Sequence, residues 1–287
     1  MAMVDSVPAA DDTLETPSGK GAADENFPVG SWLLPRELRP HVAVYYRFAR
    51  AIDDIADNPN LAPDDKIARL EAFAVALQSG SNDPALRKAE QLRLSMRETG
   101  VSIRHGLDLI SAFKQDAVKT RYESWAELVD YCDRSASPVG RFLLELHGED
   151  RALFRYSDAL CNALQVINHL QDCAVDYAQL DRVYLPQVWM RGEKATVEHL
   201  AQPKCSEALR RVLDRALERT ETLMGEARRL PRALRHGKLA AESAVIVAIA
   251  DRLIVRLRRD DPVAGRVVLN KFALAAASMR GLARLWF

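Results

Sequence analysis

The amino-acid sequence predicts an all-α protein, and three observations lead to this prediction. Apolar residues recur at helical spacing through almost every segment after Phe27. Alternation of the kind that marks strands joined by hairpin turns is hard to find. Proline and glycine breakers, such as Gly100, Pro138 and Pro203, divide the chain into about nine helical segments joined by short connections.

The bulk composition favours one packed helical domain over residues 27–287, because no long linker interrupts this part of the chain. Residues 1–26 are polar and acidic, so we expect a disordered tail that lacks the features of a signal peptide. Lys+Arg and Asp+Glu are equal at 40 each, which argues against a nucleic-acid partner. The four cysteines are irregularly spaced, which is typical of reduced thiols in a cytoplasmic protein.

An acidic motif lies on the first predicted helix, over residues 36–57. Helical geometry places Tyr46, Arg50, Asp53 and Asp57 within an arc of roughly 60°. Like charges four residues apart repel each other, so the arrangement favours a bound cation, and oxygen ligands favour Mg²⁺. The alternative is a solvated helix face or a simple Arg50–Asp53 ion pair.

A second polar stripe lies on a helix predicted over residues 151–180. Gln165, Asn168, Asp172 and Asp176 are spaced three, four and four residues apart and fall within roughly 80° of arc. A polar core network is the alternative to a binding site. Two facing stripes of oxygen ligands could instead hold a diphosphate through Mg²⁺, above a dry apolar cavity suited to a carbocation.

Five ordered motifs extend this pattern: LLP at 33–35, YxxxRxxDDxxD at 46–57, YCxxxAxxVG at 131–140, QxxNxxxDxxxD at 165–176 and VYLP at 183–186. With them, residues 27–272 resemble the squalene/phytoene synthase family, the trans-isoprenyl diphosphate synthases that join two prenyl chains head to head. The resemblance implies a class I isoprenoid synthase helical bundle with a central active-site cavity.

The resemblance also implies roles for individual residues. The expected Mg²⁺ ligands, of which the aspartates are also expected to be catalytic, are Asp53, Asp57, Asn168, Asp172 and Asp176. The expected substrate contacts are Phe27, Ser31, Tyr46, Arg50, Asp116, Lys119, Arg121, Gln165 and Gln171. Tyr131 is expected beside the reacting carbons, with an ordinary aromatic core residue as the alternative. For Asp116, Lys119 and Arg121 the alternative is a solvated face.

Departures from the family pattern narrow the expected reaction. Family members commonly carry arginine where this chain has Gln171, which removes a fixed cation and argues against the usual two-substrate condensation. Together with ENFPVGS, SPVGRFLLELHG and NHLQDCAVD, this difference resembles the hydroxysqualene synthases of bacterial hopanoid synthesis, which take presqualene diphosphate and trap the rearranged cation with water. A condensing presqualene, squalene or phytoene synthase stays open as an alternative, as does a non-catalytic helical assembly factor.

The sequence also supports expectations about His169, about the C-terminal segment and about contacts with a membrane or other enzymes. We expect His169 to be a core or supporting residue rather than a base. The C-terminal segment over residues 271–287 is apolar with basic residues, and packing on its own protein is favoured over packing on a bilayer. We expect a cytoplasmic enzyme, with a position at the inner face of the membrane as the alternative. Because the expected substrate and product are lipids, transient contact with a membrane or a pathway enzyme is expected. The sequence does not indicate the oligomeric state.

Overall fold

A computed structural model describes residues 34–286 of the chain. The expected tail over residues 1–26 and the expected substrate contacts Phe27 and Ser31 lie outside the described residues. Over the described range the all-α prediction is confirmed, since the β structure there is limited to one isolated bridge, Arg121–Val183.

Thirteen α-helices and three 3₁₀ helices make up the described part of the chain. The α-helices are α1 (Arg39–Asp57), α2 (Pro63–Ser79), α3 (Arg87–Thr99), α4 (Arg104–Asp116), α5 (Trp125–Ser135), α6 (Ser137–Leu146), α7 (Phe154–Gln171), α8 (Cys173–Leu180), α9 (Gln187–Gly192), α10 (Glu207–Ala227), α11 (Leu230–Ala233), α12 (Gly237–Arg259) and α13 (Lys271–Trp286). The 3₁₀ helices are η1 (Pro84–Leu86), η2 (Arg151–Leu153) and η3 (Val197–Ala201).

The prediction of about nine segments was wrong, because some helix boundaries hold no proline or glycine, as between α4 and α5 over residues 117–124. Even where a breaker is present, the connection is short: Pro138 stands in the first turn of α6, where a missing N–H costs no hydrogen bond, and only Ala136 separates α5 from α6. Pro231 similarly starts the short α11. A proline therefore marks a helix start here without marking a long connection.

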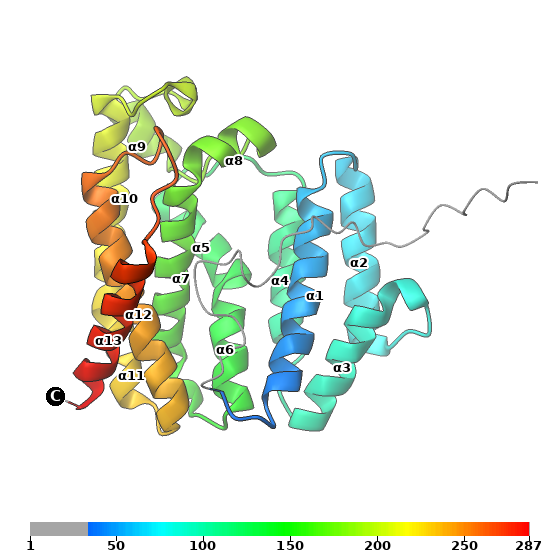
Figure 1. Ribbon diagram of the computed structural model, residues 1–287. Coiled ribbons are helices and arrows are strands. Elements are labelled where there is room, and N and C mark those ends of the chain that lie inside the picture. Colours follow the sequence, from blue (N-terminus) through cyan, green and yellow to red (C-terminus); the bar gives the residue numbers. More distant parts are fainter. Residues whose placement is uncertain (1–33, 287) are drawn as a thin grey trace, which may run out of the picture.

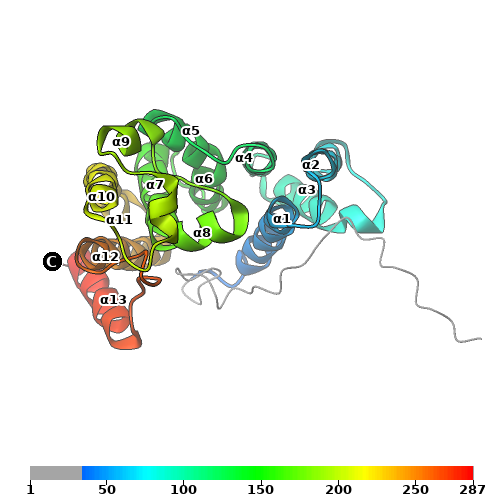
Figure 2. The same cartoon turned by 90° about the horizontal axis from the view of Figure 1, so that it is seen from above.

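The helices form two groups that lie side by side (Figures 1 and 2). In one group α1 packs on α3 and α4, and α2 packs on α3 and α4. In the other, α7 packs on α5, α6, α10 and α12. Contacts between α4 and both α5 and α6 join the groups, and α1 and α7 lie across from each other.

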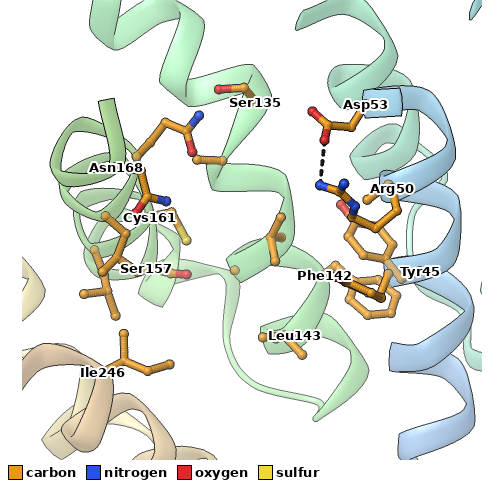
Figure 3. Close-up of a pocket in the computed structure, with 18 of the residues that line it drawn as sticks. Tyr45, Arg50, Asp53, Ser135, Phe142, Leu143, Ser157, Cys161, Asn168 and Ile246 are labelled. Carbon is orange, nitrogen blue, oxygen red and sulfur yellow. Dashed lines mark hydrogen bonds and ion pairs between the residues drawn. The ribbon is translucent and has the colours of Figure 1, made fainter. Parts of the chain in front are cut away.

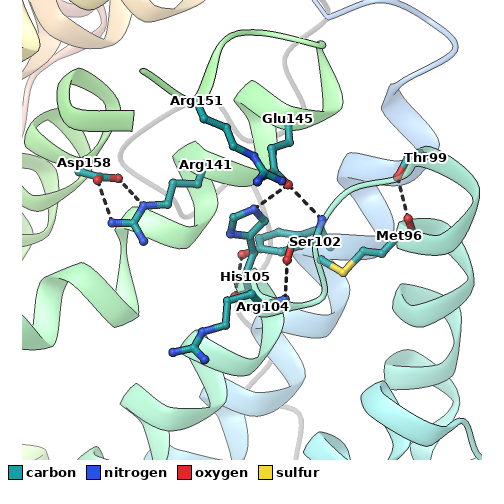
Figure 4. A network of polar contacts seen from close by, with 10 residues as sticks. Met96, Thr99, Ser102, Arg104, His105, Arg141, Glu145, Arg151 and Asp158 are labelled. Carbon is teal, nitrogen blue, oxygen red and sulfur yellow. Dashed lines mark hydrogen bonds and ion pairs between the residues drawn. The ribbon is translucent and has the colours of Figure 1, made fainter. Parts of the chain in front are cut away.

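A polar network fixes the junction between α4, α6 and η2 (Figure 4). Glu145 on α6 accepts hydrogen bonds from the Ser102 backbone N–H at 3.0 Å and from His105 Nε2 at 3.0 Å. Arg151 forms an ion pair with the same carboxylate at 2.8 Å. A half-buried carboxylate with three partners holds the two groups of helices at a defined separation.

The C-terminal helix α13 packs on α12, as favoured from the sequence. Its Gly281 makes this possible, because a Cβ at that position would lie 2.4 Å from the Ala244 backbone oxygen. The outward side of α13 exposes Phe272 and Met279. Within residues 34–286 no helix combines the length and apolar character needed to cross a membrane.

Candidate active site

A cavity of about 510 Å³ lies between α1 and α7 and is also lined by α4, α5, α6 and α12. Charged residues gather at one end and apolar residues at the other. In Figure 3, Asp53 and Asn168 lie toward one end of the pocket, while Leu143 and Ile246 lie toward the other. Of the residues expected from the sequence, ten line this cavity: Tyr46, Arg50, Asp53, Asp57, Asp116, Tyr131, Gln165, Asn168, Asp172 and Asp176.

The first acidic motif faces the cavity from the last turns of α1. Arg50 Nη1 donates to Asp53 Oδ2 at 2.7 Å, and its Nη2 donates to Asp54 at 3.1 Å. Burial, followed by the charge of Asp57, raises the pKa of Asp53 well above its usual range, although Arg50 acts in the opposite direction. A divalent cation beside Asp53 would offset both the cost of its burial and its repulsion by the neighbouring carboxylate.

The sequence analysis missed a buried arginine at this motif, Arg182, which is 6% exposed and lines the cavity. Its Nη1 donates to Asp57 Oδ1 at 2.5 Å. Its Nη2 donates to two backbone oxygens, those of Ala56 at 3.2 Å and Asp116 at 3.1 Å. Arg182 thereby joins the end of α1 to the end of α4. The available signal was its position directly before the VYLP motif.

The second motif is divided between two helices, so the prediction of one helix over residues 151–180 was wrong. Asp172 leaves helical geometry, with φ −104° and ψ 7°, and separates α7 from α8. The i to i−4 bonding nevertheless continues, since the Asp172 N–H donates to Asn168 O at 2.9 Å and the Asp176 N–H donates to Asp172 O at 2.8 Å. Because that bonding persists, the stripe still faces the cavity.

A second arginine from a connection reaches this motif. Arg266, between α12 and α13, places Nε 2.5 Å from Asp172 Oδ1 and Nη2 3.1 Å from Oδ2. Gln171 does not line the cavity; it is 1% exposed and its side-chain amide donates to the Val267 backbone oxygen at 2.5 Å. The position of Gln171 thus lacks a cation, but Arg266 supplies one beside Asp172.

An aromatic wall adjoins the two motifs. Tyr131 donates from its hydroxyl to Asp116 Oδ2 at 2.6 Å, and burial raises the pKa of Asp116 to about 7. His169 lines the cavity and stacks on Tyr184 with 3.5 Å between ring centroids. Burial, followed by the charge of Arg182, lowers the pKa of His169 to about 3, so its imidazole is neutral at physiological pH.

The bridge between Arg121 and Val183 positions this wall. The Val183 N–H donates to Thr120 O at 2.9 Å, which places Tyr184 against the start of the segment that leads into α5. Two expected substrate contacts on that segment do not line the cavity. Lys119 forms an ion pair with Glu127, and Arg121 forms one with Asp181 at 2.6 Å.

The opposite end of the cavity is apolar and aromatic. Tyr45 and Phe142 stack with 4.1 Å between ring centroids, and Ile246 lies across the pocket from them in Figure 3. The π faces of these two rings are able to stabilise a cation. A carboxyl group, Glu242, also lines this region from α12.

The donor set fits Mg²⁺ that shares its coordination with a diphosphate. No cluster of three or more His, Cys, Asp or Glu side chains arranged to hold a metal occurs within residues 34–286. Mg²⁺ in phosphate-binding sites commonly takes one or two carboxylates, with waters and phosphate oxygens completing the octahedron. The pairs Asp53/Asp57 on α1 and Asp172/Asp176 at the start of α8 each supply that number of carboxylates from opposite sides of the cavity.

Comparisons with known proteins identify a family and several similar chains. The squalene/phytoene synthase family model matches residues 21–273. The hydroxysqualene synthase of Rhodopseudomonas palustris is 43% identical over 92% of this chain and 90% of that protein. The hydroxysqualene synthase of Zymomonas mobilis is 43% identical over 88% of this chain and 86% of that protein.

Solved structures show the same architecture. The squalene synthase HpnC from Alicyclobacillus acidocaldarius superposes with a TM-score of 0.72 at 32% identity, over 83% of this chain and 90% of that one. A dehydrosqualene synthase crystallised with a ligand superposes with a TM-score of 0.75 over 92% of both chains. At 19% identity, the second similarity shows the fold alone.

Proposed function

Because the chain belongs to the squalene/phytoene synthase family, we propose that it converts presqualene diphosphate and water into hydroxysqualene and diphosphate. The similarity to two proteins named hydroxysqualene synthase supports this choice of reaction. The observation that carries the proposal is the polarity of the cavity, which is acidic where α1 faces α7 and α8 and apolar beyond them.

We assign the diphosphate end to Mg²⁺ and to polar side chains of the two motifs. The metal ligands in this proposal are Asp53, Asp57, Asn168, Asp172 and Asp176. When bound, Mg²⁺ stabilises the departing diphosphate as a leaving group. Arg50 lies 2.7 Å from Asp53, so its guanidinium is placed to donate to phosphate oxygens beside that carboxylate. Tyr46 and Gln165 line the same region as further substrate contacts.

The rest of the cavity would hold the hydrocarbon and the cation left behind when diphosphate departs. The stacked pair Tyr45–Phe142 is able to stabilise positive charge through its π faces. Tyr131 is committed to a hydrogen bond with Asp116, so in this proposal its ring faces the substrate while its hydroxyl is fixed. Apolar walls keep bulk water away from the cation while it rearranges.

One experiment separates this proposal from the main alternative, a synthase that condenses two farnesyl diphosphates. Purified protein receives either farnesyl diphosphate or presqualene diphosphate, with and without Mg²⁺ and a reductant, and the lipid products are identified. We expect Mg²⁺-dependent hydroxysqualene from presqualene diphosphate without reductant. Consumption of farnesyl diphosphate alone, with presqualene diphosphate untouched, would make the assignment wrong.

The same assay tests the third hypothesis, a non-catalytic helical assembly factor. That hypothesis requires no Mg²⁺-dependent diphosphate release from either substrate. It leaves unexplained why carboxylates gather in the cavity, since burying charged groups costs free energy even when each has an ion-pair partner. Transient contact with a membrane or a pathway enzyme completes the proposal, because the substrate and product are lipids. The cytoplasmic location is proposed from the irregular spacing of the four cysteines.

A further inference from the structure

A single carboxyl group stands apart from the acidic motifs. Glu242 lies in the first turns of α12, is 5% exposed and lines the cavity with Leu239 and Ile246. Ile246 lies one helical turn beyond Glu242 and, in Figure 3, at the end of the pocket away from Asp53. Glu242 therefore belongs to the apolar end of the cavity.

Glu242 also differs from the other buried carboxylates in having no partner. Its Oε2 meets no hydrogen-bond donor in the part of the chain that the structure describes, and no ion pair there includes it. Glu149, by contrast, is equally buried but accepts hydrogen bonds from the Arg235 and His236 backbone N–H groups at 3.2 and 2.7 Å. Burial alone raises the pKa of Glu242 to about 7.

An unpartnered carboxyl group in an apolar wall is costly, and a polar molecule in the cavity would offset that cost. The proposed reaction requires one such molecule, the water that captures the cation. This water must lie away from the departing diphosphate, because capture next to the acidic motifs would precede the rearrangement. Glu242 has an unpartnered oxygen that is able to bind a water, and it lies at the end of the cavity away from the acidic motifs.

We propose that the Glu242 carboxylate positions the capturing water and accepts its proton, an inference that rests on the proposed function. Diphosphate leaves with the electron pair of its C–O bond, and the cation rearranges. The water oxygen then forms a C–O bond to the cationic carbon, one O–H bond breaks, and the proton passes to a Glu242 oxygen. The products are the alcohol and a protonated Glu242, which later releases its proton to solvent.

His169 is the nearest rival for this role, because its Nε2 also has no hydrogen-bond partner among the described residues. Its ring, however, is stacked on Tyr184 and directly follows Asn168 in the second motif. A water held by His169 would lie at the diphosphate end, where it would quench the first cation formed. The geometry thus favours Glu242.

The test uses the full chain with presqualene diphosphate and Mg²⁺ in H₂¹⁸O. Diphosphate release is measured beside the share of hydroxysqualene among all lipid products. For Glu242→Gln we expect release within about three-fold of wild type, while the hydroxysqualene share falls roughly ten-fold or more in favour of hydrocarbons formed by proton loss. Glu242→Asp should restore part of the ¹⁸O-labelled alcohol, because it keeps a proton acceptor.

Glu226→Gln is the matched control, since Glu226 is half exposed on α10 and pairs with Arg229 at the surface. It should match wild type in both measurements. An unchanged hydroxysqualene share in Glu242→Gln would overturn the inference while leaving the proposed function standing. If instead the wild-type protein leaves presqualene diphosphate intact, the proposed function itself fails.

Discussion

Replacing Glu242 by glutamine should make the stability of the protein less sensitive to alkaline pH. Folding moves this carboxyl group from water to a site without a partner, which raises its pKa from 4.5 to about 7. Between these two values the folded state holds a proton that the unfolded state has lost. The free energy of unfolding of the wild type should therefore fall as pH rises through this range.

The magnitude follows from the two pKa values. For one group with pKa 4.5 in the unfolded chain and about 7 in the folded chain, linkage gives a loss of about 2.5 kcal/mol between pH 5 and pH 8.5. Glutamine carries no titrating proton, so this loss should be absent from the variant. The cost of burying the amide is the same at both pH values and cancels in the comparison.

The measurement is urea unfolding of wild type and Glu242→Gln at pH 5 and pH 8.5, followed by far-UV circular dichroism without Mg²⁺. The difference between the two proteins should move by about 2.5 kcal/mol in favour of the variant at the higher pH. A difference that stays constant within about 0.5 kcal/mol would refute the reasoning, because Glu242 would then be as well solvated or paired as in the unfolded chain.

Three further substitutions test other parts of the structure. Asp53→Asn should lower Mg²⁺-dependent diphosphate release by orders of magnitude, yet urea unfolding without metal should show no loss of stability, because carboxylate repulsion is relieved. Arg182→Met should lower the free energy of unfolding at pH 8 by about 3–5 kcal/mol, since it leaves Asp57 and two carbonyl groups without their donor; near-wild-type urea curves would contradict this. Gly281→Val should lower the free energy of unfolding in urea by about 1–3 kcal/mol, because its Cβ would lie 2.4 Å from a backbone oxygen of α12. Gly225→Ala, in open space on α10, should be neutral or stabilising in the same urea measurement, and equal effects of the two substitutions would contradict the packing argument.

The helical motifs could be predicted from the sequence because their information is local. Periodicity alone places Asp53 and Asp57 on one face of α1, and the structure keeps that face toward the cavity. Spacing did not reveal the break at Asp172, since the four-residue hydrogen bonds continue across it. The all-α class was equally accessible, because it depends on the spacing of apolar residues throughout the chain.

The arginines of the site could not be predicted in the same way. Arg182 and Arg266 lie outside α-helices, and their partners Asp57 and Asp172 are 125 and 94 residues away in the sequence. No periodic rule relates residues across such separations, since the paths of the connections decide which groups meet. Gln171 illustrates this limit. Its neutral side chain suggests that the site lacks a cation, but Arg266 forms an ion pair with the adjacent Asp172.

Glu242 exposes a different limit of motif reasoning. A lone glutamate before the apolar stretch of α12 carries no motif, and its chemical meaning depends entirely on what surrounds it in three dimensions. The acidic motifs are surrounded by compensating arginines, so their charges are suited to binding and releasing a diphosphate. Glu242 has no such compensation and meets only the part of the substrate that becomes a hydrocarbon cation. Ionisation and product choice are thus assigned to opposite ends of one cavity, and a change at the apolar end can redirect the product without weakening the step that forms the cation.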